Sequence, residues 1–140
     1  MKKISLFLMT LFVLSVLSLA ACSGKASVSI SGEWTLVSYG DASNPAPAVP
    51  DVETSISFDE KGQFGGSVGC NSFGSEYKAD GVKITFGSII STMMFCEETS
   101  SQESVVLGIL SDKTVNYQVD GDELKITSSD GASVVVLLRK

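Results

Sequence analysis

The sequence predicts a mainly β protein of the α+β class, with a small antiparallel sheet of about eight strands and one packed helix. Short runs of alternating apolar and polar residues follow one another along residues 32–139, separated by turns rich in glycine and aspartate. Only residues 99–113 have the apolar spacing of a helix. Because many short antiparallel strands leave exposed edges, we expect the sheet to close into a barrel, with a two-sheet sandwich as the alternative.

The chain opens with the pattern of a secretory signal. Lys2 and Lys3 precede an uncharged apolar run over residues 4–20, which is short for a transmembrane helix. The run leads into Leu-Ala-Ala-Cys, which resembles the lipobox of bacterial lipoproteins. The resemblance implies a signal peptide at 1–21, cleavage before Cys22, and diacylglycerol and an acyl chain such as palmitate on that cysteine. An uncleaved anchor helix is the alternative.

Behind this signal we expect a lipidated tether at residues 22–30 and one domain at 31–140. Cleavage removes two lysines and leaves eight basic side chains against sixteen acidic ones, a net charge near −8. This charge excludes nucleic acid as an expected partner and limits membrane contact to the lipid on Cys22. Because of the signal peptide and the lipid expected on Cys22, the protein is expected in the cell envelope, outside the cytoplasm. The residue after Cys22 is Ser23 and not aspartate. In a cell with two membranes, the usual sorting rule for lipoproteins then favours the outer membrane.

The first predicted strand, residues 32–40, alternates apolar and polar side chains between two glycines. Trp34, Leu36 and Ser38 are expected on its inward face. The next segment, 41–52, contains all three prolines of the chain, so it is expected to be a loop, because proline cannot donate to a strand ladder.

Two predicted hairpins follow. Residues 54–58 and 63–68 are joined by an Asp-Glu-Lys-Gly turn, and glycines in the return strand indicate a bulge or close packing against another backbone. Residues 72–79 and 82–86 are joined by Asp80 and Gly81, a strong hairpin signal.

The predicted helix begins with Ser-Ser-Gln-Glu, a capping-box pattern in which Ser100 and Glu103 would satisfy each other's backbone donors. Val106, Ile109 and Leu110 mark its apolar face. Three strand-like runs separated by Asp-Gly turns come next and predict a meander, at residues 114–119, 123–127 and 133–139.

The two cysteines of the domain, Cys70 and Cys96, form an even number in a chain expected to be exported. A disulfide between them would close a loop of about 26 residues and stabilise the fold by about 3 kcal/mol. Buried free thiols are the second interpretation. A catalytic thiol is the third, because the chain has no histidine to activate one.

Other residue patterns that could suggest a catalytic or metal site are better explained by structural roles. Without histidine a Ser-His-Asp triad is impossible, and adjacent acidic pairs do not face each other across a cleft. The Asp-Gly-Asp-Glu run at 120–123 lacks the ligand spacing of a calcium loop. Gly32-Glu33-Trp34 resembles the first-strand signature of lipocalins, but a tryptophan closing one barrel end explains it as well. We expect no enzyme activity, no metal and no cofactor.

One apolar cluster is ambiguous. Met93, Met94 and Phe95 stand next to Cys96 at an expected strand-to-loop transition. Methionine adapts to varied shapes, so the cluster could line a pocket or a partner site. The alternative is that these side chains belong to the core.

Taken together, the motifs resemble the META domain, or HslJ-like, family of bacterial heat-shock-associated and envelope lipoproteins. The resemblance spans about residues 31–139 and rests on G-C-N-x-F and S-T-x-M-x-C elements, with a strand tryptophan before them and a helix glutamate after them. The residues that carry it are Trp34, Gly69, Cys70, Asn71, Phe73, Tyr77, Thr92, Met94, Cys96 and Glu103. The family often has a basic residue at position 93 and a glycine at 75, where this chain has Met93 and Ser75.

The resemblance implies a conical or barrel-like β domain whose motif residues are scaffold, with Cys70 and Cys96 near each other and no established enzymatic activity. It favours a stress-related binding or accessory role for a lipid-anchored envelope protein. Two alternatives remain: a carrier that holds a small hydrophobic ligand or lipid inside the barrel, and a pilotin-like or inhibitory protein that binds another envelope protein. A carrier needs an internal cavity, whereas an accessory protein needs an exposed apolar patch.

Overall fold

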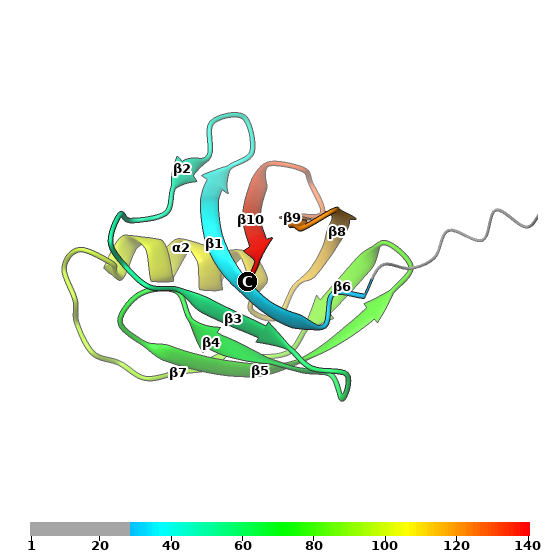
Figure 1. Cartoon of the computed structure of the whole chain (residues 1–140), viewed down its shortest axis with the longest axis horizontal. Helices are drawn as coiled ribbons and strands as arrows, with labels where there is room; N and C mark the ends of the chain where they lie inside the picture. Colours follow the sequence, from blue (N-terminus) through cyan, green and yellow to red (C-terminus); the bar gives the residue numbers. More distant parts are fainter. Residues whose placement is uncertain (1–28) are drawn as a thin grey trace, which may run out of the picture.

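The eight main strands form a closed antiparallel barrel, which confirms the predicted fold class (Figure 1). The computed structural model describes residues 29–140. The predicted signal peptide, Cys22 and most of the predicted tether lie outside the described residues. Around the barrel the order is β1 (Gly32–Asp41), β3 (Ser55–Phe58), β4 (Gln63–Ser67), β5 (Ser72–Asp80), β6 (Lys83–Phe86), β8 (Thr114–Asp120), β9 (Glu123–Thr127) and β10 (Ser133–Arg139), and β10 pairs with β1 to close it.

Three short elements complete the domain. The two-residue strands β2 (Ala46–Pro47) and β7 (Ile90–Ser91) pair with β1 and β5 respectively. The helix α2 (Ser100–Leu110) stands between β7 and β8 in the sequence, so the last three strands form the predicted meander after it.

The turns follow the glycine signals of the sequence. Gly81 and Gly121 have φ angles of 60° and 58° and connect β5 to β6 and β8 to β9. Gly66 in β4 has a φ of 146°, and a side chain there would overlap the carbonyl oxygen of Ser55 on the neighbouring strand. The predicted close packing of backbones in this hairpin is thus confirmed, and it explains why β4 carries glycine at this position.

A bulge in β1 changes which side chains reach the core. The pairing of β1 with β10 shifts register between Leu36 and Ser38. Trp34 and Leu36 point inward as predicted, but beyond the bulge Tyr39 is buried and Ser38 is only half-buried. The prediction for Ser38 was wrong, because one extra residue reverses the alternation of a strand.

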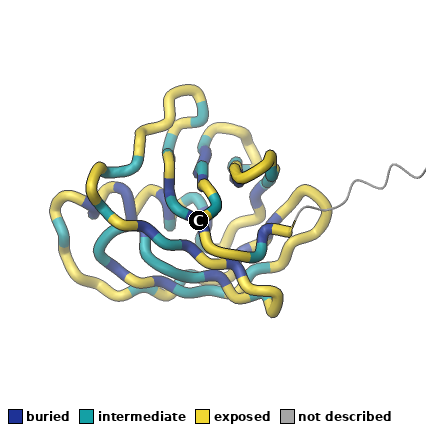
Figure 2. Tube along the Cα trace, viewed as in Figure 1, coloured by how far each residue is buried: buried dark blue, intermediate teal, exposed yellow. Residues whose placement is uncertain are grey.

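Large side chains fill the centre of the barrel. Buried positions alternate with exposed ones along the strands (Figure 2). The rings of Phe58, Phe64 and Phe86 form its aromatic part, with centroids 4.8 to 6.3 Å apart. Aliphatic side chains from all parts of the barrel surround them, including Ile56, Ile84, Leu124, Ile126, Val135 and Leu137. Burial of these side chains supplies the main driving force for folding.

The helix α2 lies against β1 and β10 (Figure 1) and contributes Val106 and Leu110 to the core. Its predicted capping box was wrong. The N-cap residue is Thr99, which makes no side-chain capping bond, and the hydroxyl of Ser100 donates to the carbonyl of Glu97. Glu103 turns away from the helix backbone toward the barrel. Within residues 29–140, no helix has both the length and the apolar character needed to cross a membrane.

Candidate functional site

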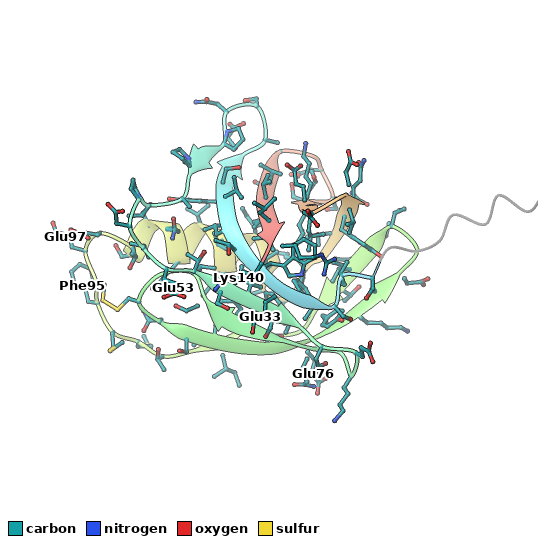
Figure 3. All side chains as sticks on the ribbon, viewed as in Figure 1. Glu33, Glu53, Glu76, Phe95, Glu97 and Lys140 are labelled. Atoms are coloured by element: carbon teal, nitrogen blue, oxygen red, sulfur yellow. A yellow bond between two sulfur atoms is a disulfide. The ribbon has the colours of Figure 1, made fainter. Side chains whose placement is uncertain are left out.

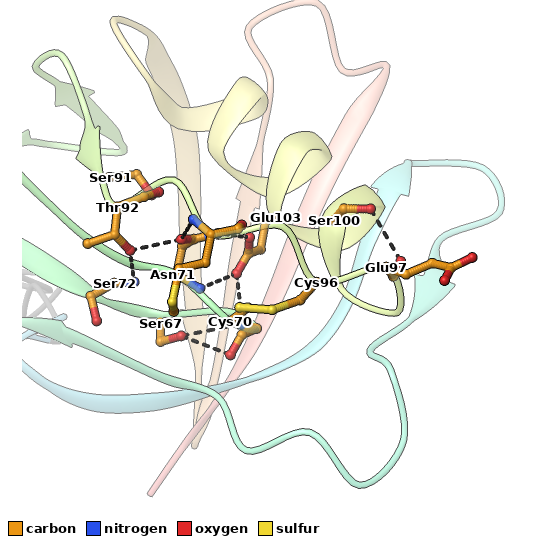
Figure 4. Close-up of a disulfide and its surroundings, with 12 residues drawn as sticks. Ser67, Cys70, Asn71, Ser72, Ser91, Thr92, Cys96, Glu97, Ser100 and Glu103 are labelled. Carbon is orange, nitrogen blue, oxygen red and sulfur yellow. Dashed lines mark hydrogen bonds between the residues drawn. A yellow bond between two sulfur atoms is a disulfide. The ribbon is translucent and has the colours of Figure 1, made fainter.

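A disulfide joins two segments at the end of the barrel where β4 ends and α2 begins (Figure 4). Cys70 lies just before β5, and Cys96 lies in the loop between β7 and α2; their Cα atoms are 6.2 Å apart. Because the bond occupies both sulfur atoms, the free-thiol and catalytic-thiol interpretations find no support. The bond ties the loop after β7 to the barrel.

Asn71, next to the disulfide, fixes the same loop with its side-chain amide. Its Oδ1 accepts hydrogen bonds from the hydroxyl of Thr92 and the backbone N–H of Met94, both at 2.8 Å. Its Nδ2 donates to the carbonyl of Met94 at 2.9 Å and to Oε2 of Glu103 at 2.7 Å. All four hydrogen-bonding positions of the amide are therefore used, and Met94 is held through both of its backbone polar groups.

Glu103 connects this cluster to the helix. Its Oε1 accepts hydrogen bonds from the backbone N–H groups of Cys70 and Asn71, each at 2.5 Å. The side chain of Glu103 is buried, so these are charge-assisted bonds shielded from water. Gly69 makes the close approach of the helix feasible, because a Cβ atom there would lie 2.7 Å from the Cβ of Thr99.

Gln102, the residue before Glu103, was not singled out by the sequence analysis but is fully buried. Its Nε2 donates to the carbonyl of Val68 at the end of the β4 segment, and its Oε1 accepts from the N–H of Val49 in the proline-rich loop at 2.8 Å. A polar residue in the first turn of a helix gives no signal for such distant partners. Gln102 and Glu103 together place the start of α2 on the barrel.

The loop that these bonds hold presents apolar side chains to solvent. Met93 is 98% exposed, Phe95 is 82% exposed, and Met94 is 60% exposed. Ile90 in β7 is 80% exposed as well. We call these four residues the apolar tip. The interpretation that Met93 to Phe95 belong to the core was therefore wrong, and the physical reason is the fixed backbone of Met94, which directs the loop outward.

Phe95 and Glu97 lie at one extreme of the molecule in Figure 3. Two side chains that follow the tip, Glu97 and Glu98, are acidic and exposed. The motif residues Gly69, Cys70, Asn71, Thr92, Met94, Cys96 and Glu103 thus gather at this end of the barrel. They form the hydrogen-bonded base of an exposed apolar loop, which two exposed carboxylates follow.

The remaining motif residues lie in the barrel itself. Trp34 is fully buried, and its indole N–H donates to the carbonyl of Ile30 at 2.9 Å. The guanidinium of Arg139 lies 4.2 Å from the centre of the indole ring and donates to the carbonyls of Ser29 and Ser31. This cation–π contact fastens the segment that enters the barrel, so the tryptophan has a structural explanation.

Phe73 and Tyr77 belong to β5. Phe73 is buried, with its ring 5.1 Å from that of Phe64. The hydroxyl of Tyr77 donates to the carbonyl of Asp59 at 2.6 Å. Partial burial, together with the nearby negative charges of Asp59 and Glu60, raises the pKa of Tyr77 above its ordinary value, against the opposing effect of a hydrogen bond with Ser31.

Comparison with known families and structures fits this geometry. The family model described as META domain matches residues 27–140. The chain belongs to the META domain family. Among solved structures, it is similar to the NMR structure of a protein from Burkholderia xenovorans, with 22% identity and a TM-score of 0.62 over 79% of this chain and 82% of that one.

A second similar structure is the crystal structure of a DUF4847 family protein from Bacteroides vulgatus ATCC 8482, with 18% identity and a TM-score of 0.58 over 79% of this chain and 93% of that one. At these identities the two structures support the fold of the META domain and nothing more specific. A search of curated proteins found no match.

The polar groups of this end of the barrel are used within the scaffold. Both oxygens of Glu103 are occupied by hydrogen bonds within the scaffold. Among residues 29–140, no three His, Cys, Asp or Glu side chains are grouped to hold a metal ion. An open groove of about 460 Å³ lies at the other end of β5, between residues 29–31 and the β5–β6 turn, and another of about 280 Å³ lies beside the end of α2.

Proposed function

We propose that this META domain protein is a non-enzymatic envelope lipoprotein that binds a partner through the apolar tip, in an accessory role linked to stress tolerance. The anchor rests on the signal pattern that leads to Cys22. The binding role rests on one observation: Met93 and Phe95 are 98% and 82% exposed on a loop held by Asn71 and a disulfide. Contiguous exposed apolar side chains rimmed by polar ones mark interaction sites.

The way in which the tip is held supports this role. Fixing the backbone of one residue costs about 1–2 kcal/mol in conformational entropy. A binding loop that is already held in one shape has lost this entropy before the partner arrives, which favours tighter binding. Three hydrogen bonds between the Asn71 side chain and Thr92 or Met94, together with the nearby disulfide, fix the loop in this way.

The carrier alternative has less support. A small-molecule site is a cavity of about 300–1,000 Å³ that surrounds its ligand. Here the barrel centre is occupied by Trp34, Phe58, Phe86 and Leu137, each at most 2% exposed. A bound lipid or hydrophobic ligand would have to displace these side chains, whereas the apolar tip is already accessible.

The proposal is tested by complementation in cells that lack the protein, under envelope stress. A double variant, Met93→Ser with Phe95→Ser, should lose complementation while its melting temperature stays within about 2 °C, because both side chains are exposed. Val82→Ser is the matched control, since Val82 is also an exposed apolar residue, 67% accessible, but lies in the β5–β6 turn.

Cys22→Ala tests the anchor separately. We expect this variant to lose its acyl groups and leave the membrane fraction. Full complementation by the Met93→Ser, Phe95→Ser variant would contradict the binding role of the tip, and membrane retention of Cys22→Ala would contradict the lipid anchor.

A further inference from the structure

We infer that the partner of the apolar tip is an envelope protein with an apolar groove edged by lysine or arginine side chains, bound at the end of the domain that faces away from the anchoring membrane. The inference rests on the proposed function, because it uses both the anchor and the tip.

The charge around the tip identifies the edge of the partner site. No lysine or arginine occurs in residues 84–112, which include the tip and α2. None occurs in residues 41–60, which include the proline-rich loop that Gln102 ties to the start of α2. Glu97 and Glu98 are exposed next to the tip. Across protein interfaces, potentials of opposite sign face each other, so a partner with basic residues around its apolar centre fits this surface.

The opposite end of the barrel carries charges of both signs. Lys78 in β5 and Lys83 in β6 flank the β5–β6 turn. This turn borders the groove whose other wall is the 29–31 segment, where the described chain begins. Glu60 and Asp80 also line this groove, so the orientation rests on position: this end lies beside residues 29–31, where the tether joins the domain, and the acidic tip lies at the other end of β5.

Distances along β5 separate the two ends. Cys70 stands just before β5, and β5 itself runs from Ser72 to Asp80, nine residues. At about 3.3 Å per residue the strand spans roughly 27 Å. Residues 22–28 contain seven residues, whose fully extended reach is at most about 25 Å. The tether joins the domain at the 29–31 end, and reaching the tip end would use its whole extended length, so we expect the tip to lie on the side farther from the membrane that holds Cys22.

Two other binding partners fit the apolar tip less well. A second copy of the chain meeting tip to tip would bring Glu97 and Glu98 of both copies together, and like charges in an interface are unfavourable. An anionic lipid surface would be repelled by the same carboxylates. The four side chains of the tip are too few for a whole interface, which buries about 800 Å² per partner, but they suit its centre, with the acidic residues as the rim.

The test places the photo-reactive amino acid p-benzoylphenylalanine at position 95 of the full-length protein in its native cells. The matched probe at position 82 reports an exposed apolar residue outside the tip. Illumination should give one protein adduct at 95 that is absent at 82. The cross-linked protein is then identified by mass spectrometry, purified and titrated with the mature chain. We expect Phe95→Ser to weaken binding at least 10-fold, and Glu97→Lys with Glu98→Lys to weaken it about 10-fold.

Raised salt should weaken binding to the wild-type chain and have less effect on the charge-reversed chain. An adduct with lipid, an adduct with a second copy, no adduct, or a protein whose affinity is unchanged by charge reversal would each overturn the inference. The proposed function fails independently, if the Met93→Ser, Phe95→Ser variant complements fully.

Discussion

Replacing Glu103 by alanine should destabilise the domain strongly, although the residue lies in the first turn of a helix. The carboxylate accepts the backbone N–H groups of Cys70 and Asn71 and one N–H of the Asn71 side chain. Glu103 and Asn71 are 8% and 7% exposed, so water does not readily replace the lost acceptor. Glu103→Ala therefore leaves three donors without a partner.

The size of the effect follows from these three bonds. A hydrogen bond to a charged group contributes about 1.5–3 kcal/mol, and an unsatisfied buried donor costs about 1–3 kcal/mol. Because the three bonds share one carboxylate they are not additive, and we expect a loss of about 3–5 kcal/mol in the free energy of unfolding. For a domain of this size that corresponds to a fall in melting temperature of roughly 12–20 °C.

The assay is thermal or urea unfolding followed by the fluorescence of Trp34, the only tryptophan in the chain. Ser100→Ala is the matched control. The hydroxyl of Ser100 makes one long bond of 3.3 Å to the carbonyl of Glu97, so its loss should cost less than about 0.5 kcal/mol. If Ser100→Ala cost about 1 kcal/mol and Glu103→Ala a similar amount, the capping box would be right, and the bonds of Glu103 to Cys70 and Asn71 would not carry the stability assigned to them.

Three further variants test separate features. Gly108→Ala should raise stability by about 0.5–1 kcal/mol, because its added methyl meets open space on the helix, and no gain in urea unfolding would refute this. Gly66→Ala should prevent folding or cost more than about 4 kcal/mol, since its Cβ would overlap the carbonyl of Ser55; a folded variant near wild-type stability would contradict the strand packing. The pKa of Asp130 is lowered by hydrogen bonds from the Ser128 hydroxyl and from the backbone N–H of Ala132. The stability that this carboxylate contributes is therefore present above its unfolded pKa and lost as pH falls through the folded one. Ser128→Ala should raise the pKa of Asp130 in an NMR titration, and an unchanged value would exclude the hydroxyl as its cause.

The barrel could be predicted because its signals are local. Asp-Gly turns and alternating side chains mark the hairpins directly, and Val106 and Leu110 identify the inner face of α2. The burial of Tyr39 in place of Ser38 could not be predicted, because the bulge in β1 exists only in its pairing with β10, about one hundred residues away.

The site was harder to predict from the sequence, because its contacts also join residues that are far apart in the chain. Ser100 and Glu103 match a local capping pattern, but Glu103 finds better donors 32 and 33 residues away, because Gly69 lets the helix start approach the barrel. Met93 and Phe95 look like core residues by composition. Their exposure goes with contacts that are distant in the sequence: Asn71 holds the backbone of Met94, 23 residues away, and the disulfide holds Cys96.

The most direct test of the account is the backbone mobility of the apolar tip, measured by ¹⁵N relaxation on the mature chain. We predict order parameters for Met93, Met94 and Phe95 near 0.85, as in the barrel strands, because the disulfide and Asn71 hold the loop before any partner binds. Values below about 0.6, with the loop moving independently of the barrel, would contradict a preformed binding site.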